Sequence, residues 1–388
     1  MAQFKMPTLN RRSLFMTAAA AGALTSKIAL AGAEASAFVR GKDGMWPRLP
    51  DVDTESRGDF LLGMSIMNNG GWLQQAARER AAVILKGAGI DPEAATPFDK
   101  AVTLLSGDPV LESYAASRST HQRLKYRLLQ REFHSKADEY LAAFEAAEKQ
   151  GKRPLELNPT MFLPEYTKSE IHTQPGGYVG DPFAGYMYRY GTDWGVNNGR
   201  SFQDGGHIAQ AAGVATPTNG KVKRVLDLGT SIGQLATSMK SRFPEAEVWG
   251  IDVGAPMVRY AHMKAVNQGS DVAFAQRLAE DTKFPDDHFD VVTASILFHE
   301  VTAEAAKKIL RETARVLRPG GVFYPLDFYT QRPPPKTGWE QFSAFWTHRW
   351  NNEDWMLEYA ALDFEGEMKK SGMKVGRGTN GNLFGTKA

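Results

Sequence analysis

From Lys223 onward the sequence alternates short apolar runs with helix-like segments, and this alternation constrains the fold more than any other feature. The apolar runs are RVLDLG, EVWGIDVG, VAFAQRLAED, FDVVTASILFHEV and GVFYPLDFY. The segments between them, among them QLATSMKSRFP and APMVRYAHMKAVNQG, end at the helix breakers Pro244 and Gly269. Such alternation predicts a doubly wound, Rossmann-like α/β sheet of parallel strands with crossover helices on both faces.

The turn after the first apolar run is expected to approach a ligand closely. Gly229 and Gly233 in RVLDLGTSIGQ carry no Cβ, and the turn lies at the carboxyl end of a strand, where such sheets bind ligands. Asp252 ends the next strand, where a carboxylate can accept two hydrogen bonds from a ribose diol. The spacing matches neither the dinucleotide fingerprint nor a P-loop. Asp227, two residues before the first glycine, suits a cationic amino acid better than a phosphate.

Four motifs occur in order along this region: VLDLGTSIGQ, GIDVGAPMVRYA, AEDTKFPDDHFDVV and ARVLRPGGVF. Through them, residues 222–328 resemble the core of class I S-adenosylmethionine-dependent methyltransferases, of the small-molecule branch typified by quinone-biosynthesis enzymes. Ser231 replaces the middle glycine of the family's first motif. The segment MKVGRGTNGNLFGTK reads as a hairpin turned by Asn380–Gly381, like the paired sixth and seventh strands that end the family's sheet. The resemblance implies a seven-stranded, mostly parallel sheet with a C-terminal antiparallel hairpin.

The resemblance also implies a cofactor, S-adenosyl-L-methionine, and roles for single positions. Asp227 would orient the turn and the amino group of the ligand, Asp252 would hold the ribose, and Ser295 would lie near the sulfonium. Leu278 departs from the family, which often has an acid at that position beside the adenine pocket. The residues expected to bind the cofactor are Asp227, Gly229, Thr230, Ser231, Gly233, Asp252, Val253, Ala279, Glu280 and Ser295.

Two histidines are candidates for other roles. His299, in SILFHE, occupies a segment where this branch often has a histidine, and it could act as a general base on a hydroxyl acceptor or simply form part of the pocket wall. His172 has no Asp, Glu or His partner at metal-ligand spacing, so it reads as a structural or substrate-contact residue. With cysteine also absent, the sequence predicts no metal site.

The first residues read as an export signal. Arg11 and Arg12 precede a weakly apolar stretch, and Ala35-Ser36-Ala37 supplies small residues for a signal peptidase. We therefore expect residues 1–37 to be a twin-arginine-type signal peptide and the protein to be periplasmic or exported. A cytoplasmic protein with an amphipathic N-terminal helix is the alternative. The apolar stretch is too short to form a stable membrane span.

The remaining regions divide by composition. Residues 38–160 are expected to form a helical N-terminal region, in which an apolar stripe recurs from Tyr126 to Phe144. Residues 161–220 combine glycines with aromatic residues and read as a lid over a ligand or as a packed connector. Residues 221–388 would form the methyltransferase domain, with an aromatic cap insertion at about 331–366.

The aromatic insertion bears on the acceptor. Its tryptophans and phenylalanines either roof the site, which would suit a small hydrophobic or aromatic acceptor, or only attach a cap helix to the core. The formal net charge of +2 gives no reason to expect nucleic acid as a partner. Neither the acceptor nor the oligomeric state follows from the sequence.

An export signal conflicts with this activity, because S-adenosylmethionine is made in the cytoplasm. Three functions therefore remain open: a methyltransferase, an exported non-catalytic binding module that keeps the fold, and another nucleotide-linked enzyme on the same sheet. The presence of the residues expected to bind the cofactor favours the methyltransferase, since a decayed site would be expected to lose Asp227 or Asp252.

Overall fold

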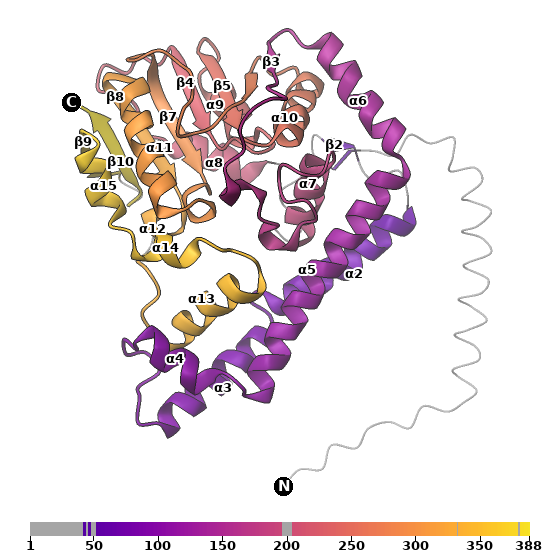
Figure 1. The fold of residues 1–388 in the computed structure, drawn as a ribbon, viewed down its shortest axis with the longest axis vertical. Coiled ribbons are helices and arrows are strands. Elements are labelled where there is room, and N and C mark those ends of the chain that lie inside the picture. Colours follow the sequence, from indigo (N-terminus) through magenta and orange to yellow (C-terminus); the bar gives the residue numbers. More distant parts are fainter. Residues whose placement is uncertain (1–41, 44–45, 48–51, 196–203, 332, 379–380) are drawn as a thin grey trace, which may run out of the picture. The chain divides into compact units, whose positions relative to one another are not determined.

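The computed structural model describes residues 42–43, 46–47, 52–195, 204–331, 333–378 and 381–388 (Figure 1). The chain divides into two units at Pro50, and residues 51–388 make up the larger one. In the first unit, β1 (Lys42–Asp43) and β2 (Trp46–Pro47) pair antiparallel. The expected signal peptide, residues 1–37, lies outside the described residues.

The second unit is built on an eight-stranded sheet with the order β3-β6-β5-β4-β7-β8-β10-β9. Strands β3 to β8 run parallel, whereas β10 pairs antiparallel with both β8 and β9. The predicted α/β sheet with a C-terminal hairpin is thereby confirmed. The strands predicted from sequence are β4 (Arg224–Leu228), β5 (Glu247–Asp252), β6 (Ala273–Gln276), β7 (Phe289–Ser295), β8 (Leu317–Leu326), β9 (Met373–Arg377) and β10 (Leu383–Lys387).

The eighth strand was not expected from the sequence. It is β3 (Leu155–Glu156), which follows the helical region and pairs parallel with β6 at the edge of the sheet. Because it has only two residues, it shows no alternation that a sequence pattern could detect. The N-terminal region therefore contributes to the sheet itself.

The strands place apolar side chains on both faces of the sheet, because successive residues point to opposite sides. In β4, Val225 belongs to one buried cluster, while Leu226 and Leu228 belong to the other. Helices α9 (Gln234–Arg242) and α10 (Ala255–Gln268) contribute to the cluster that contains Val225. Helices α11 (Ala303–Val316) and α15 (Phe364–Lys370) contribute to the cluster on the opposite face. This is the two-sided cover expected of a doubly wound sheet.

Long helices precede the sheet in sequence: α2 (Val52–Asn68), α3 (Trp72–Gly87), α4 (Phe98–Leu105), α5 (Pro109–Ser135) and α6 (Ala137–Gln150). The apolar stripe predicted from Tyr126 to Phe144 runs across α5 and α6, and Tyr126, Phe133 and Phe144 are buried. The two helices are separate because the backbone of Lys136 leaves helical geometry (φ −125°, ψ 34°). The stripe therefore faces the protein core rather than a partner.

The glycine–aromatic segment contains the short 3-10 turns η1 (Glu165–Lys168) and η2 (Ile171–Thr173), followed by α7 (Ala184–Gly195) and, farther along, α8 (Gly205–Gly213). The ring of Tyr186 lies 4.7–5.2 Å from the rings of Tyr140, Phe144 and Tyr260. These contacts join the N-terminal helices to α10. This half of the segment is thus a packed connector.

The aromatic insertion forms α12 (Phe328–Gln331), α13 (Gly338–Trp350) and α14 (Met356–Ala361). Helix α13 lies beside α3 and α4 (Figure 1). Trp339, Phe342 and Phe345 pack into the cluster formed by α3, α4 and α5, with Phe345 6.3 Å from Phe98 between ring centroids. These three rings attach the insertion to the N-terminal helices.

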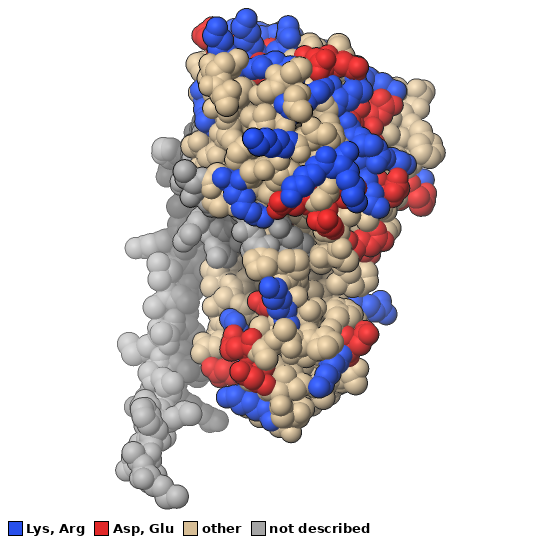
Figure 2. All heavy atoms as spheres, turned by 90° about the vertical axis from the view of Figure 1, so that its left-hand side faces the viewer, with Lys and Arg blue, Asp and Glu red and all other residues tan. Residues whose placement is uncertain are grey.

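On the face shown in Figure 2, Lys and Arg side chains are interspersed with Asp and Glu. Among the described residues, Lys387 and Asp287 form an ion pair at 2.7 Å. Within the part of the chain that the structure describes, no helix combines the length and apolar character that a bilayer crossing requires.

Candidate active site

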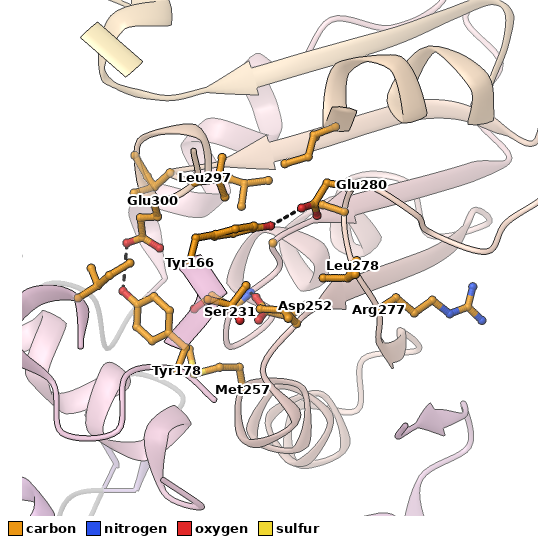
Figure 3. Close-up of a pocket in the computed structure, with 18 of the residues that line it drawn as sticks. Tyr166, Tyr178, Ser231, Asp252, Met257, Arg277, Leu278, Glu280, Leu297 and Glu300 are labelled. Atoms are coloured by element: carbon orange, nitrogen blue, oxygen red, sulfur yellow. Dashed lines mark hydrogen bonds between the residues drawn. The ribbon is translucent and has the colours of Figure 1, made fainter. Parts of the chain in front are cut away.

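A cavity lies beyond the carboxyl ends of β4, β5 and β7 (Figure 3). Its empty space is about 820 Å³, including the mouth. We call it the main cavity. It brings together residues from separate motifs, as the topology of a parallel sheet requires. Seven of the residues expected to bind the cofactor line this cavity: Gly229, Ser231, Asp252, Val253, Ala279, Glu280 and Ser295.

Asp252 is fixed by backbone hydrogen bonds at the end of β5. The Ser231 N–H donates to one carboxylate oxygen at 2.9 Å, and the Gly254 N–H donates to the other at 2.9 Å. Burial raises the pKa of Asp252 to about 6, although these hydrogen bonds oppose the shift. The carboxylate is therefore oriented before any ligand arrives, as a group that accepts hydrogen bonds from ribose hydroxyls needs to be.

The turn between β4 and α9 has a backbone that favours glycine. Gly229 (φ 59°) and Gly233 (φ 73°) are both left-handed, and Ser231 between them is left-handed as well (φ 52°). A Cβ on Gly229 would lie 2.8 Å from the Leu297 side chain. Ser231, at the middle position of the motif, thus adopts a backbone conformation that glycine adopts freely and that is strained for serine.

Asp227 lies beneath this turn and does not line the main cavity. Its carboxylate is buried and accepts hydrogen bonds from the hydroxyls of Thr230 and Thr293, both at 2.7 Å. Burial raises the pKa of Asp227 to about 6. The geometry suits the orienting role expected for this residue, while its contact with an amino group stays a prediction. Thr230 and Gly233 belong to the same turn and are joined by a backbone hydrogen bond, but they do not line the cavity either.

His299 is buried behind the cavity wall rather than in its lining. Its Nδ1 lies 2.9 Å from the Asp327 carboxylate, and its ring lies 4.8 Å from that of Phe328. Burial lowers the pKa of His299, but Asp327 outweighs this effect and raises it to about 9. His299 does not line the cavity, and Asp327 favours the protonated ring, so the general-base role stays a prediction. Asp327 was not singled out in the sequence because nothing local marks it.

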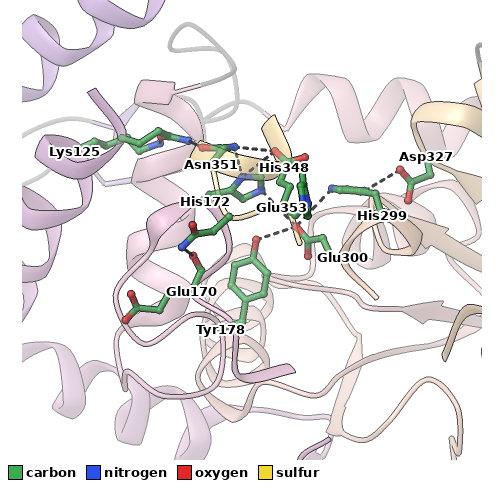
Figure 4. A network of polar contacts seen from close by, with 12 residues as sticks. Lys125, Glu170, His172, Tyr178, His299, Glu300, Asp327, His348, Asn351 and Glu353 are labelled. Atoms are coloured by element: carbon green, nitrogen blue, oxygen red, sulfur yellow. Dashed lines mark hydrogen bonds and ion pairs between the residues drawn. The ribbon is translucent and has the colours of Figure 1, made fainter. Parts of the chain in front are cut away.

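His172 lies in a polar network that the sequence did not reveal (Figure 4). Its Nε2 is 3.5 Å from Glu300 Oε1, and its Nδ1 is 3.3 Å from Glu353 Oε1. Burial lowers the pKa of His172, yet these two carboxylates raise it to about 9. The sequence suggested no partner for His172, because no Asp, Glu or His lies at metal-ligand spacing from it. Its partners, Glu300 and Glu353, come from distant parts of the chain.

One side of the cavity is aromatic, and the sequence predicted only some of its residues. Tyr178 and Tyr188 line it, so these two side chains of the glycine–aromatic segment form pocket wall, whereas Tyr186, on the same helix as Tyr188, packs in the core. Tyr166, which the sequence did not single out, also lines the cavity and donates a hydrogen bond to Glu280 (Figure 3). Leu278, the residue that departs from the family pattern, lies in the lining as well.

Binding of the cofactor is expected to weaken as the pH falls below about 6. The carboxylate form of Asp252 accepts hydrogen bonds from ribose hydroxyls, so the bound state should lower its pKa from the value of about 6 in the free protein. Affinity is then full above this pH and decreases below it by up to about tenfold per pH unit. Calorimetric titrations between pH 5 and 8 would measure this, and a constant affinity would contradict it.

Comparison with known families decides the class of this region. Residues 225–321 match the family described as a methyltransferase domain. This part of the chain is a methyltransferase domain. The class I fold and the S-adenosylmethionine-dependent class predicted from the motifs are confirmed for it.

Several curated relatives are methyltransferases named for quinone biosynthesis. The chain is 43% identical over 114 residues to the demethylmenaquinone methyltransferase of Thermus thermophilus, covering 29% of this chain and 50% of the relative. It is 31% identical over 121 residues to the ubiquinone/menaquinone biosynthesis C-methyltransferase UbiE of Laribacter hongkongensis, covering 31% and 49%. The chain therefore spans about half the length of these relatives.

Among solved structures, a putative methyltransferase from Bacillus halodurans is similar at 23% identity and a TM-score of 0.36. The similarity covers 45% of this chain and 71% of that one.

Proposed function

We propose that the protein transfers a methyl group from S-adenosylmethionine to a small hydrophobic or aromatic acceptor. The observation that carries the proposal is the convergence of seven of the ten expected cofactor-binding residues on one cavity at the carboxyl edge of the sheet. Asp252 and the left-handed turn at Gly229 lie in that cavity with the orientation such binding needs. The names of the curated relatives support the same reaction class.

The lining supports an apolar acceptor. Beyond the segments expected to bind the cofactor, the lining includes the charged residues Arg277 and Glu300, but most of it is aromatic or aliphatic, with Tyr166, Ile171, Tyr178, Tyr188 and Leu297. Such side chains favour a ring or an alkyl chain over a highly charged molecule. Quinone precursors, which the relatives' names indicate for those proteins, belong to this chemical class.

In this function the protein acts mainly by positioning. The turn between β4 and α9 and the carboxylate of Asp252 would hold the cofactor, while the aromatic side would hold the acceptor in line with the sulfonium methyl. Alignment at about 3–3.5 Å can supply much of the rate of such a displacement. The apolar lining also limits water around the reacting atoms.

Replacement of Asp252 by alanine is expected to weaken binding of S-adenosylmethionine by about 1.5–3 kcal/mol, because the hydrogen bonds to a charged group are lost. Calorimetric titration of the full chain with the cofactor and with S-adenosylhomocysteine would measure the change. Glu247→Ala, at the opposite end of β5, is the matched control and should bind normally. Unchanged affinity of D252A would remove Asp252 from the site.

An exported, non-catalytic binding module is the second candidate, supported by the Arg11-Arg12 pattern and the Ala35-Ser36-Ala37 sequence. Such a module would bind the cofactor but transfer no methyl group to any acceptor in a screen, whereas the enzyme would turn over repeatedly. We also propose export itself. Recovery of periplasmic protein that begins at Phe38 would support it, and recovery of only the full-length cytoplasmic chain would contradict it.

A further inference from the structure

We propose that His172, His299 and Glu300 form a binding site for one divalent transition-metal ion of the Zn²⁺ type, at the wall of the main cavity (Figure 4). Each residue offers one ligand atom, and these atoms lie within 4.8 Å of one another. The residues come from η2 and from η4 (Phe298–Glu300), two turns separated by more than one hundred residues of sequence. Only the folded chain brings them together.

The distances fit ligands of a shared ion better than hydrogen bonds between the ligands. Glu300 Oε1 lies 3.5 Å from His172 Nε2 and 3.7 Å from His299 Nε2. Good hydrogen bonds between these atom types are near 2.9 Å. Two ligands that bind one ion tetrahedrally at 2.0–2.1 Å lie roughly 3.3 Å apart. A small contraction around an ion would bring both pairs to that spacing.

The second nitrogen of each ring also has a polar partner. His299 Nδ1 lies 2.9 Å from Asp327 Oδ1, whereas His172 Nδ1 lies 3.0 Å from the side-chain nitrogen of Asn351 and 3.3 Å from Glu353 Oε1. The carboxylate at His299 Nδ1 favours the tautomer and orientation that direct Nε2 toward a metal, and metal-binding histidines usually have such a partner. Both Nε2 atoms point to the same oxygen of Glu300 (Figure 4).

The set of ligands indicates the kind of ion. Two imidazoles and one carboxylate suit Zn²⁺ and neighbouring transition metals, and catalytic sites with three protein ligands leave a further position open. Of the three ligands, Glu300 lines the main cavity, so the ion would lie at the edge of the space where an acceptor would bind. The Tyr178 hydroxyl donates to Glu300 Oε1 at 3.1 Å and holds this carboxylate in place.

The alternative is a network of two imidazolium rings paired with carboxylates. Such a network would need no metal, whereas metal binding has to displace the proton from each Nε2. The two accounts differ in whether the protein binds a metal ion stoichiometrically through these three side chains.

The role of the ion rests on the function proposed above, and it narrows the acceptor to a molecule with a hydroxyl group near an apolar ring. The hydroxyl oxygen would bind the ion and release its proton to solvent. That oxygen would then form the O–CH₃ bond as the CH₃–S bond breaks, with sulfur keeping the electron pair. The products are a methyl ether and S-adenosylhomocysteine.

The test is a titration of the metal-stripped full chain with Co²⁺, which reports ligand geometry through its visible absorption. We expect one ion per chain with intense tetrahedral or five-coordinate bands. His172→Ala and Glu300→Gln should each weaken binding at least about 100-fold, and Asp327→Asn, which changes only the carboxylate behind His299, by about 10–100-fold. His288→Ala, at the opposite end of β7 from the cavity, is the control and should bind normally.

Titration of S-adenosylmethionine into the same samples separates this proposal from the proposed function. A variant that still binds the cofactor is folded, so its loss of Co²⁺ binding supports the metal site. The metal site would be overturned if the folded protein failed to bind Co²⁺ stoichiometrically, or if H172A and E300Q bound Co²⁺ as tightly as the wild type. The cofactor site would be unaffected by either result. Metal binding without cofactor binding would overturn the methyltransferase function instead.

Discussion

Replacement of Asp204 by asparagine is expected to lower the free energy of unfolding by about 3–5 kcal/mol, because it removes a buried carboxylate that pairs with buried positive charge. Asp204 begins α8 and is buried. One of its carboxylate oxygens lies 2.9 Å from the ammonium of Lys264, a side chain with 0% exposure, and the other lies 3.8 Å from Arg189. Neither cation can reach bulk water when the carboxylate is removed.

Asparagine isolates the charge in this experiment. The backbone of Asp204 is left-handed (φ 49°), a conformation that asparagine tolerates, and the side-chain amide can still accept the 2.6 Å hydrogen bond from Gln234. The deficit should shrink as the pH rises past about 8, because burial lowers the pKa of Lys264 to about 8 and the folded ammonium is then neutral in both proteins.

Denaturant unfolding of the wild type and D204N would measure the effect. Glu365→Gln is the matched control, since its partner Lys369 at 2.9 Å is more than half exposed, and removal of a surface pair costs about 0–1 kcal/mol. A loss in D204N no larger than that of E365Q would show that Lys264 and Arg189 are stabilised without Asp204.

Features encoded by neighbouring residues were predictable from the sequence. The strands, the crossover helices and the turn at Gly229 each depend on a pattern shorter than twenty residues, so they could be recognised one at a time. Topology then places the ends of β4 and β5 at one edge, which is why Asp252 could be assigned to the same site as the Gly229 turn, whereas Ser295 was assigned through the family resemblance.

Features encoded by distant residues were not predictable in this way. His172 and Glu353 are held together by folding and share no local pattern, and the same is true of Asp204 and Lys264. Aromatic residues posed a related problem, because Tyr178 in the cavity wall and Tyr186 in the core look alike in sequence. Only packing determines which ring meets a ligand and which meets another ring.

Replacement of Gly233 by alanine is expected to destabilise the protein by about 2–5 kcal/mol. The left-handed backbone (φ 73°) costs an L-residue about 1–2 kcal/mol, and overpacking costs about 1–3 kcal/mol more. The overpacking arises because the new Cβ would lie 2.8 Å from Phe274 Cζ and 3.0 Å from the Ala261 Cβ. Since Gly233 closes the turn that carries Ser231, cofactor binding should weaken as well.

The variant Gly220→Ala separates the backbone cost from the overpacking cost. Gly220 is also left-handed (φ 67°), but a Cβ there would meet nothing within 4 Å, so Gly220→Ala should show the backbone cost alone, about 1–2 kcal/mol. Denaturant unfolding of both variants would give the steric part as the difference.

The steric part can be tested further by making room for the added methyl group. Phe274→Leu removes the ring atoms nearest to Gly233, and alone it leaves a cavity in the core beside β6. In the double variant the new methyl group occupies part of that cavity. The combined loss should therefore be smaller than the sum of the single losses by about 1–2 kcal/mol, which a double-mutant cycle measures directly. Strict additivity would mean that the tight contact between the turn and Phe274 does not limit this position, and that the left-handed backbone alone requires glycine there.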